Sequence, residues 1–298
     1  MIKLITHNDL DGVGCYVVAK YFLDAEIDVS YCNYKNVNEI VLNVIKNHEQ
    51  YDEILITDIS VNEEVAEKLN NLKGKVKLLD HHPTALFLNK YTWAKVEIEC
   101  DKGKTCGTQM LFDDLKSVSN DYIKCIPKLF VELVRRYDTW EWKDKYNDEK
   151  PRKLNDLMYI VGKEYFIEDM LLKINTGVDI FDNFSLKLLE LRQKEVDRYI
   201  EKKDDNLIIK DILGYNAGIV FADNFISELG DKLSELHPEL DFIAMINQET
   251  VSYRTTKDNI NLSEVAKHFG GGGHPKASGS QMDKRCVDDF IEDIFNIK

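Results

Sequence analysis

The sequence has no long apolar run and little proline or glycine. No uninterrupted apolar stretch approaches the about 18 residues that a membrane-spanning helix needs. The segment Met1–Asp9 reaches polar residues too soon for a signal peptide. With 5 prolines and 15 glycines among 298 residues, collagen-like and low-complexity chains are excluded. We therefore expect a folded, cytoplasmic protein with no membrane partner and enough chain for one large domain or two ordinary ones.

Basic residues are too few to balance the acidic ones. The chain has 39 Lys and Arg against 53 Asp and Glu, which leaves a formal charge of −14. A charge of this sign repels polyanions at long range, which argues against a protein that coats or tracks long nucleic acid. Any phosphate ligand must therefore be attracted locally.

The six cysteines include no CxxC pair, and a chain of this size needs no disulfide bonds to fold. We interpret them as free thiols. The spacing of Cys100 and Cys106 differs from that of zinc knuckles, which disfavours a structural zinc site.

Hydrophobic patterning predicts an α/β fold in the first half of the chain. Short β-branched runs predict buried strands, and the amphipathic stretches between them predict helices. The expected strands are Ile2–Thr6, Ile27–Cys32, Ile54–Asp58 and Val76–Asp80, and the expected helices are Val13–Leu23, Val37–Asn47 and Val61–Leu72, the last with Ser60 as its N-cap. This alternation implies right-handed crossovers and a mostly parallel sheet.

The rest of the chain predicts more helices and a second, smaller α/β domain. The expected helices are Thr105–Leu115, Tyr122–Tyr137 and a long connecting helix at Phe184–Lys203, and Lys143–Lys153 is expected to be a surface loop. Beyond Asp204 we expect strands at Leu207–Ile212, Ala217–Ala222, Phe242–Asn247 and Val251–Thr255, with helices at Phe225–Leu236 and Leu262–Phe269. We predict a first domain over residues 1–180, a connecting helix over 181–204 and a second domain over 205–298.

Acidic and histidine residues follow three of the predicted strands. They are Asp9 and Asp11 after the first strand, Asp58 after the third, and Asp80, His81 and His82 after the fourth. Each carboxylate alone could cap a helix. Two adjacent histidines behind an aspartate are harder to explain as core packing, because each buried imidazole needs a partner. Since the carboxyl ends of parallel strands meet at one edge of a sheet, we expect these side chains to converge.

A further carboxylate, Asp138, ends a predicted helix and can join this group. Oxygen and imidazole ligands suit Mn²⁺ or Mg²⁺, and Asp58 is central enough to bridge two ions about 3.5–4 Å apart. Together Asp9, Asp11, Asp58 and Asp138 bring four negative charges, which would protonate or repel one another without cations. Two divalent cations would neutralise them.

These motifs resemble those of the DHH phosphoesterase superfamily, and in particular the branch that carries a C-terminal DHHA1 domain. The motifs HNDLDG, TDIS, LDHHPT and YDTW occur in this order and are followed by a glycine-histidine motif, so the resemblance covers essentially the whole chain. The branch includes RecJ-like exonucleases, oligoribonucleases that act on nano-RNA, and phosphodiesterases of small dinucleotides. The resemblance implies a catalytic DHH domain over 1–180 and a substrate-binding DHHA1 domain over 205–298.

The resemblance also implies roles for individual residues. The implied metal ligands are His7, Asp9, Asp11, Asp58, His81 and Asp138. His82 is expected to contact the scissile phosphate, and Asp80 to orient an imidazole. The implied substrate-binding residues are Arg254, Gly271, Gly272, Gly273 and His274. Without the resemblance, the glycine run would be interpreted as a hinge or a helix C-cap, and Arg254 as a surface strand residue.

We therefore predict a two-metal phosphodiesterase, with Mn²⁺ preferred and Mg²⁺ as the alternative, that hydrolyses short oligonucleotides or dinucleotides to nucleoside monophosphates. A phosphodiesterase of cyclic dinucleotides and a phosphatase of bisphosphorylated nucleosides are the enzymatic alternatives. A non-catalytic nucleotide-binding regulator is the alternative from another class, which the complete set of matched metal positions disfavours. A homodimer is compatible with an enzyme of this size, although no residue demands one.

Overall fold

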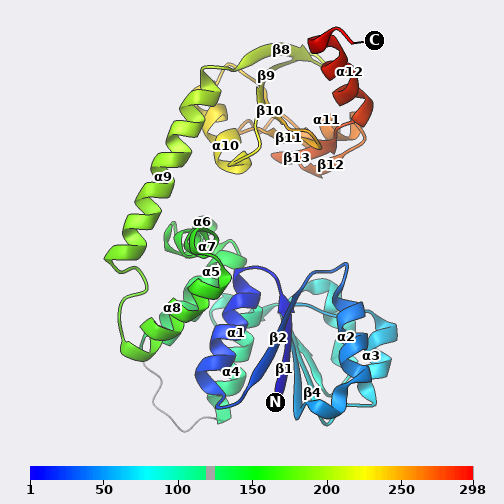
Figure 1. Cartoon of the computed structure of the whole chain (residues 1–298), viewed down its shortest axis with the longest axis vertical. Coiled ribbons are helices and arrows are strands. Elements are labelled where there is room, and N and C mark those ends of the chain that lie inside the picture. The colour runs from blue at the N-terminus through cyan, green and yellow to red at the C-terminus, as the bar shows by residue number, and fades with distance from the viewer. Residues whose placement is uncertain (119–124, 298) are drawn as a thin grey trace. The chain divides into compact units, whose positions relative to one another are not determined.

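The computed structural model describes residues 1–118 and 125–297. The chain divides into two units, Met1–Leu189 and Glu190–Lys298, each built around its own sheet (Figure 1). Among the described residues, no helix combines the length and the apolar character needed to cross a membrane.

The first unit contains a five-stranded, fully parallel sheet with the strand order β2-β1-β3-β4-β5. Its strands are β1 (Ile2–His7), β2 (Ile27–Cys32), β3 (Glu53–Thr57), β4 (Val76–Asp80) and β5 (Ala94–Val96). The predicted mostly parallel sheet is confirmed. The central strands β1, β3 and β4 are neighbours, so the segments that follow them meet at the same edge of the sheet.

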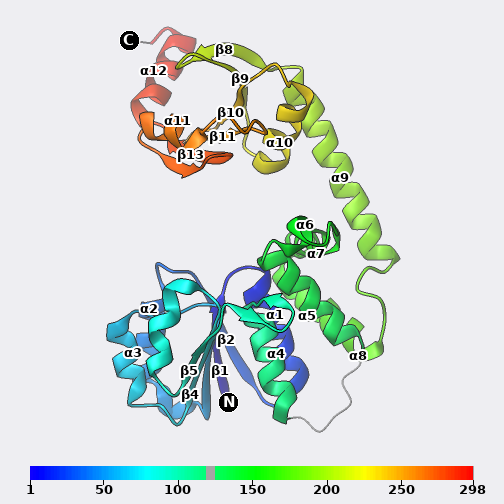
Figure 2. The same cartoon turned by 180° about the vertical axis from the view of Figure 1, so that it is seen from behind.

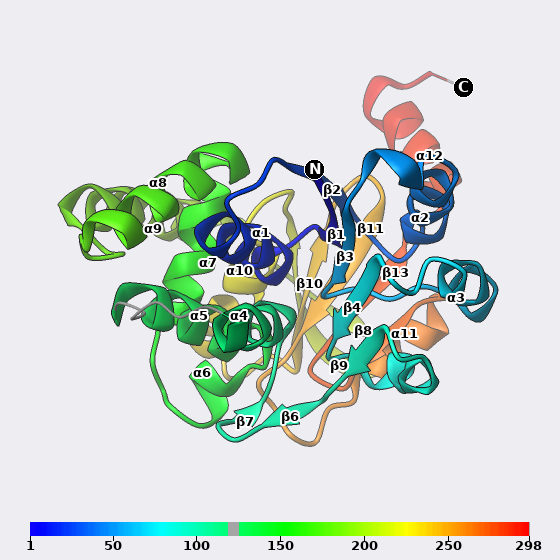
Figure 3. The same cartoon turned by 90° about the horizontal axis from the view of Figure 1, so that it is seen from below.

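Helices cover both faces of this sheet. In Figure 3, α1 (Leu10–Phe22) and α4 (Gly107–Val118) lie on one side of the strands, and α2 (Val37–Lys46) and α3 (Glu63–Asn70) lie on the other. Because side chains alternate along a strand, Leu4 packs in the core shared with α1 and α4, whereas Ile5 packs in the core shared with α2 and α3. Both side chains are fully buried.

The remainder of the first unit is mainly helical. It comprises the 3-10 helices η1 (His48–Gln50) and η2 (Pro83–Lys90), a short hairpin of β6 (Glu99–Cys100) and β7 (Gly103–Lys104), and the helices α5 (Cys125–Asp138), α6 (Glu141–Asp144), α7 (Lys150–Val161) and α8 (Lys163–Thr176). A long helix, α9 (Asn183–Asp204), continues from the first unit into the second.

The second unit contains a mixed six-stranded sheet with the order β12-β13-β11-β10-β9-β8. Its strands are β8 (Ile208–Ile212), β9 (Tyr215–Phe221), β10 (Phe242–Ile246), β11 (Thr250–Arg254), β12 (Gly272–His274) and β13 (Ala277–Gln281), and its helices are α10 (Ile226–Leu236), α11 (Leu262–His268) and α12 (Lys284–Phe295) (Figure 2). Only β9 and β10 pair in parallel. The helices α10 and α11 pack against opposite faces, since Ile243 contributes to the α10 core and Phe242 to the α11 core.

Two local predictions were wrong. Helix α3 begins at Glu63 and is capped by Asn62, whose side chain accepts a hydrogen bond from Val65 N at 2.9 Å, and not by Ser60. The predicted loop over 143–153 is partly helical, because Pro151 in the first turn of α7 removes a backbone N–H that a helix start leaves unpaired anyway. The predicted start of a helix at Tyr122 lies outside the described residues.

Two glycines allow the first unit to pack closely around the predicted motifs. A Cβ atom at Gly12 would lie 2.0 Å from the carbonyl oxygen of His7, and one at Gly107 would lie 2.5 Å from Cβ of Asp58. Both distances are shorter than any real Cβ contact, so these positions require glycine. The close approaches bring α1 against the end of β1, and α4 against the segment after β3.

We expect Gly12→Ala to lower the free energy of unfolding by about 2–3 kcal/mol, because the new methyl group meets backbone rather than a side chain that can move. Urea denaturation followed by circular dichroism measures the change. Gly74→Ala is the matched control, since nothing lies within 4 Å of its added Cβ. An equal loss of stability in both variants would contradict the close-approach explanation.

Candidate active site

Three neighbouring strands deliver the predicted residues to one edge of the first unit's sheet. His7 is the last residue of β1, Asp58 follows β3 directly, and Asp80 is the last residue of β4. Asp58 has a φ of 57°, a left-handed conformation that aspartate adopts more readily than most residues. Its backbone N–H donates to Leu79 O at 3.0 Å, which ties this turn to β4.

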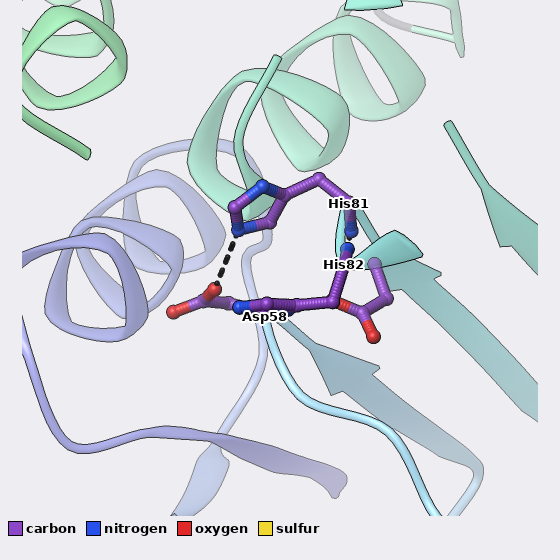
Figure 4. A group of neighbouring side chains, drawn as sticks. Asp58, His81 and His82 are labelled. Atoms are coloured by element: carbon purple, nitrogen blue, oxygen red, sulfur yellow. Dashed lines mark hydrogen bonds and ion pairs between the residues drawn. The ribbon is translucent and has the colours of Figure 1, made fainter. Parts of the chain in front are cut away.

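The side chain of His81 lies at the centre of a group of carboxylates. Its Nε2 atom is 3.2 Å from Asp58 Oδ1, 3.5 Å from Asp138 Oδ2 and 3.9 Å from Asp11 Oδ2. Figure 4 shows the ring of His81 directed at Asp58. On the other side of Asp58, His7 Nδ1 lies 2.6 Å from Asp9 Oδ2 and 4.0 Å from Asp58 Oδ2.

The six predicted metal ligands therefore converge as two groups of three. Each group offers donor atoms within 4.8 Å of one another, and the groups are His7, Asp9 and Asp58, and Asp11, His81 and Asp138. Asp58 also lies within hydrogen-bond distance of His81 in the second group. The bridging role of Asp58 stays a prediction.

The electrostatics of this cluster test whether its residues suit a cation. Asp58 is 1% exposed, and its Oδ2 atom is buried without a hydrogen-bond partner among the described residues. Burial, and then the charges of Asp11 and Asp9, raise the pKa of Asp58 well above its usual value and that of Asp138 to about 9. A divalent cation would relieve both effects, and carboxylate and imidazole donors suit Mn²⁺ or Mg²⁺. The residues fit a divalent-cation site.

Two of the carboxylates also organise the helices around the cluster. Asp9 caps α1 by accepting a hydrogen bond from Gly12 N at 3.1 Å. Asp11 accepts bonds from Gly107 N at 2.6 Å and Thr108 N at 2.8 Å, both in the first turn of α4. Each carboxylate oxygen has two lone pairs, so these bonds leave capacity for a metal. The helix-capping and metal-binding interpretations are therefore compatible at both positions.

A buried arginine holds the end of α5, where Asp138 lies. Arg135 is fully buried, and its guanidinium donates to Glu141 Oε2 at 2.6 Å, to Lys104 O at 2.8 Å and to Glu132 Oε1 at 2.9 Å. These contacts fix α5 to the start of α6 and to the β6–β7 hairpin. Asp138 thus reaches the cluster from a rigid helix end.

His82 belongs to a further donor group, with Asp58, Asp80 and His81, whose donor atoms also lie within 4.8 Å of one another. It also forms a hydrogen-bonded chain with Asp80 and Tyr34. Its Nδ1 lies 2.7 Å from Asp80 Oδ1, and its Nε2 lies 2.9 Å from the hydroxyl of Tyr34. The hydrogen bond to Asp80 raises the pKa of His82. Burial is the largest single effect and would raise the pKa of Asp80. The hydrogen bond and charge of His82, together with Ser60 and His81, outweigh burial and lower that pKa. Asp80 is therefore hydrogen-bonded to the imidazole of His82, and its predicted orienting role stays a prediction.

Sequence reasoning missed Tyr34. It follows β2, which is the neighbour of β1 in the sheet, so its side chain reaches the same edge as His7 and His82. The only signal in the sequence was its place after a predicted strand. The order of strands in the sheet, which the sequence alone did not provide, was needed to bring it to the cluster.

A second group of predicted residues lies in the second unit. Arg254 on β11 pairs with Ala277 on β13, which pairs with His274 on β12, so the three form one row across adjacent strands. Residues directly opposite one another project to the same face of a sheet. The side chain of Arg254 lies along Gly230 of α10, and its Nη2 is 3.4 Å from Ser227 Oγ.

The glycine run combines two structures. Gly270 and Gly271 end α11, since their N–H groups donate to Lys267 O at 3.1 Å and Ala266 O at 2.8 Å. This is the helix C-cap that the sequence allowed as an alternative. Gly272 and Gly273 instead belong to the edge strand β12, beside His274.

Comparisons with known proteins place the chain in a family. The DHHA1 domain family matches residues 205–297. Oligoribonuclease NrnB of Bacillus subtilis is 38% identical over 309 residues, which cover 100% of this chain and 77% of that protein. The chain belongs to the DHH/DHHA1 phosphoesterase superfamily.

Solved structures show the same DHH/DHHA1 fold. The pGpG-specific phosphodiesterase PggH of Vibrio cholerae has a TM-score of 0.54 and 13% identity, with 99% of this chain and 98% of that chain covered. The exonuclease RecJ bound to manganese has a TM-score of 0.54 and 13% identity, with 97% and 88% covered.

We expect Mn²⁺ to stabilise the folded DHH/DHHA1 protein, by about 2.7 kcal/mol at a concentration 100 times its Kd, because only the folded chain assembles the donor groups. Thermal unfolding with Mn²⁺ or EDTA measures the effect, and Asp58→Asn should remove most of it. Asp114→Asn is the control, since Asp114 pairs with Lys77 outside the cluster. Stabilisation that survives in Asp58→Asn would contradict the proposed role of Asp58.

Proposed function

We propose that this protein is a divalent-cation-dependent phosphodiesterase that hydrolyses short oligonucleotides to nucleoside monophosphates. The observation that carries the proposal is the convergence of two three-residue donor groups around the buried carboxylate of Asp58. The similarity to an oligoribonuclease over the whole chain supports the choice of substrate.

The donor groups assign the first unit its part in the reaction. We propose that His7, Asp9 and Asp58 hold one cation and that Asp11, His81 and Asp138 hold the other, with Mn²⁺ preferred over Mg²⁺. Cations bound there would polarise a phosphate oxygen and lower the pKa of an attacking water molecule. Helix N–H groups hold the carboxylates of Asp9 and Asp11, and Arg135 holds the helix end that carries Asp138, so the donor atoms need little rearrangement to receive cations.

His82 is proposed to contact the phosphate of the substrate. Because its Nδ1 atom is hydrogen-bonded to Asp80, the Nε2 atom is the ring nitrogen that can bind the substrate. That atom is hydrogen-bonded to the hydroxyl of Tyr34, and the side chain of His82 is 29% exposed, so a phosphate oxygen can take the place of this hydroxyl. Asp80 then acts by holding the imidazole in orientation rather than by touching the substrate.

The row of Arg254 and His274 is proposed to bind a further phosphate of the substrate, together with the backbone of Gly272 and Gly273. The predicted contribution of Gly271 is not proposed again, because its N–H already donates to Ala266 O. Two strand spacings separate Arg254 from His274, or about 10 Å. An arginine can donate two parallel hydrogen bonds to a phosphate, which gives orientation as well as affinity. The net charge of −14 supports short substrates, since it favours local over long-range attraction of phosphate.

We expect the purified protein with Mn²⁺ to release nucleoside monophosphates from a linear dinucleotide, and Asp58→Asn to lower kcat by about 1000-fold or more, because the shared carboxylate lies between both donor groups. Chromatography of the products measures the reaction. Cyclic dinucleotide, bisphosphonucleoside and a long single strand complete the panel. Tight dinucleotide binding without turnover would instead indicate a non-catalytic nucleotide-binding regulator.

We expect Arg254→Gln to raise KM for a dinucleotide by about 10- to 100-fold, the size of one lost charged hydrogen bond, with a smaller effect on kcat. Steady-state kinetics separates the two constants. Arg285→Gln is the matched control, because Arg285 is highly exposed and pairs only with Asp283 among the described residues. A loss of kcat at constant KM would show that Arg254 does not act by binding substrate.

A further inference from the structure

Tyr34 is an exposed aromatic residue at the edge of the candidate metal centre. Its ring centroid lies 5.3 Å from that of His7 and 5.8 Å from that of His82, and its hydroxyl lies 2.9 Å from His82 Nε2. The side chain nevertheless remains 56% exposed. A tyrosine with this exposure buries little of its ring in the core, so packing alone does not explain its position.

The backbone around Tyr34 is held in a tight turn between β2 and α2. Asn36 Oδ1 accepts a hydrogen bond from Asn33 N at 2.8 Å, and Asn33 Oδ1 accepts one from Lys35 N at 2.9 Å. The N–H groups of Asn36 and Val37 donate to Asn33 O. The turn therefore fixes the backbone independently of the contact between Tyr34 and His82.

This arrangement pre-positions an aromatic face beside the place where the scissile phosphate is proposed to bind. A ring held by a turn, by His7 and by His82 loses little conformational entropy when a ligand packs on it. Single-stranded nucleic acids are commonly bound by stacking a base on such an exposed aromatic side chain. Substrates without a base, such as polyphosphate, would gain nothing from it.

We propose that Tyr34 is a specificity-determining residue that stacks on the nucleobase next to the phosphodiester at the candidate metal centre. The inference rests on the proposed function and adds to it a reason why the substrate is a nucleotide rather than any phosphodiester. When a phosphate oxygen takes the Nε2 position of His82, the turn Asn33–Asn36 and the contact with His7 still hold the ring.

The test compares Tyr34→Leu and Tyr34→Phe on two substrates with Mn²⁺. One is a 5′-phosphorylated dinucleotide, and the other is its abasic counterpart, which keeps the sugars and phosphates. We expect Tyr34→Leu to raise KM for the dinucleotide by about 5- to 100-fold, the range for one stacked base, and to change KM for the abasic compound by less than about twofold. Tyr34→Phe keeps the ring and should stay within about threefold of the wild type on both.

Tyr165→Leu is the matched control, because Tyr165 is 48% exposed on α8 and should affect neither substrate. An equal rise in KM for both substrates in Tyr34→Leu would overturn the inference. So would a fall in kcat in Tyr34→Phe at constant KM, which would show that the hydroxyl acts through His82.

Binding separates this inference from the proposed function. Calorimetry with a non-hydrolysable dinucleotide, in which methylene replaces the bridging 3′ oxygen, gives a Kd for the wild type and for Tyr34→Leu without any turnover. We expect the Kd of Tyr34→Leu to be higher by the same factor as its KM. Equal Kd values would overturn the role of Tyr34 even in an active enzyme, whereas a wild type that binds but does not hydrolyse would overturn only the proposed function.

Discussion

Like charges packed at one edge of a parallel sheet are the constraint on which the first unit depends. Asp9, Asp11, Asp58 and Asp138 lie close enough that their repulsion, added to burial, raises the pKa of Asp58 and Asp138. Such an arrangement costs free energy in the absence of a cation. The fold tolerates this cost because each carboxylate is held in place. Helix N–H groups bind Asp9 and Asp11, and His81 contacts Asp58. Arg135 fixes the helix end that carries Asp138.

The same edge explains why distant motifs work together. Each crossover returns the chain to the opposite edge of the sheet before the next strand begins, so parallel strands all end at the same edge. His7, Asp58 and Asp80 arrive there from three adjacent strands, and Tyr34 from the next strand along. In the second unit, antiparallel pairing likewise brings distant residues together, because Arg254 and His274 both pair with Ala277 of β13.

Much of this could be predicted from the sequence. The four strands from β1 to β4 begin and end within about a residue of the predicted positions. Short β-branched runs bounded by polar residues are typical of buried strands, so both the type and the ends of these elements could be predicted. Motif order then predicted the metal ligands, and the structure brings the six predicted side chains together. Helix α8 was missed, and the first turn of α7 was assigned to a loop while the rest of α7 was not predicted, because the helicity of such segments depends on packing. The Tyr34–His82 contact required the strand order, which hydrophobic patterning does not provide.

The hydrogen bonds that Asp11 receives from Gly107 and Thr108 have a consequence for ion selectivity. They fix the two oxygen atoms of Asp11 through the backbone of another helix, so these oxygens would have little freedom to move apart around a bound cation. Small ions such as Mg²⁺ sit at about 2.0–2.1 Å from oxygen, whereas Ca²⁺ needs about 2.3–2.6 Å and more ligands. Oxygen atoms held in this way would favour an ion of small radius, so we expect calcium to compete poorly for them.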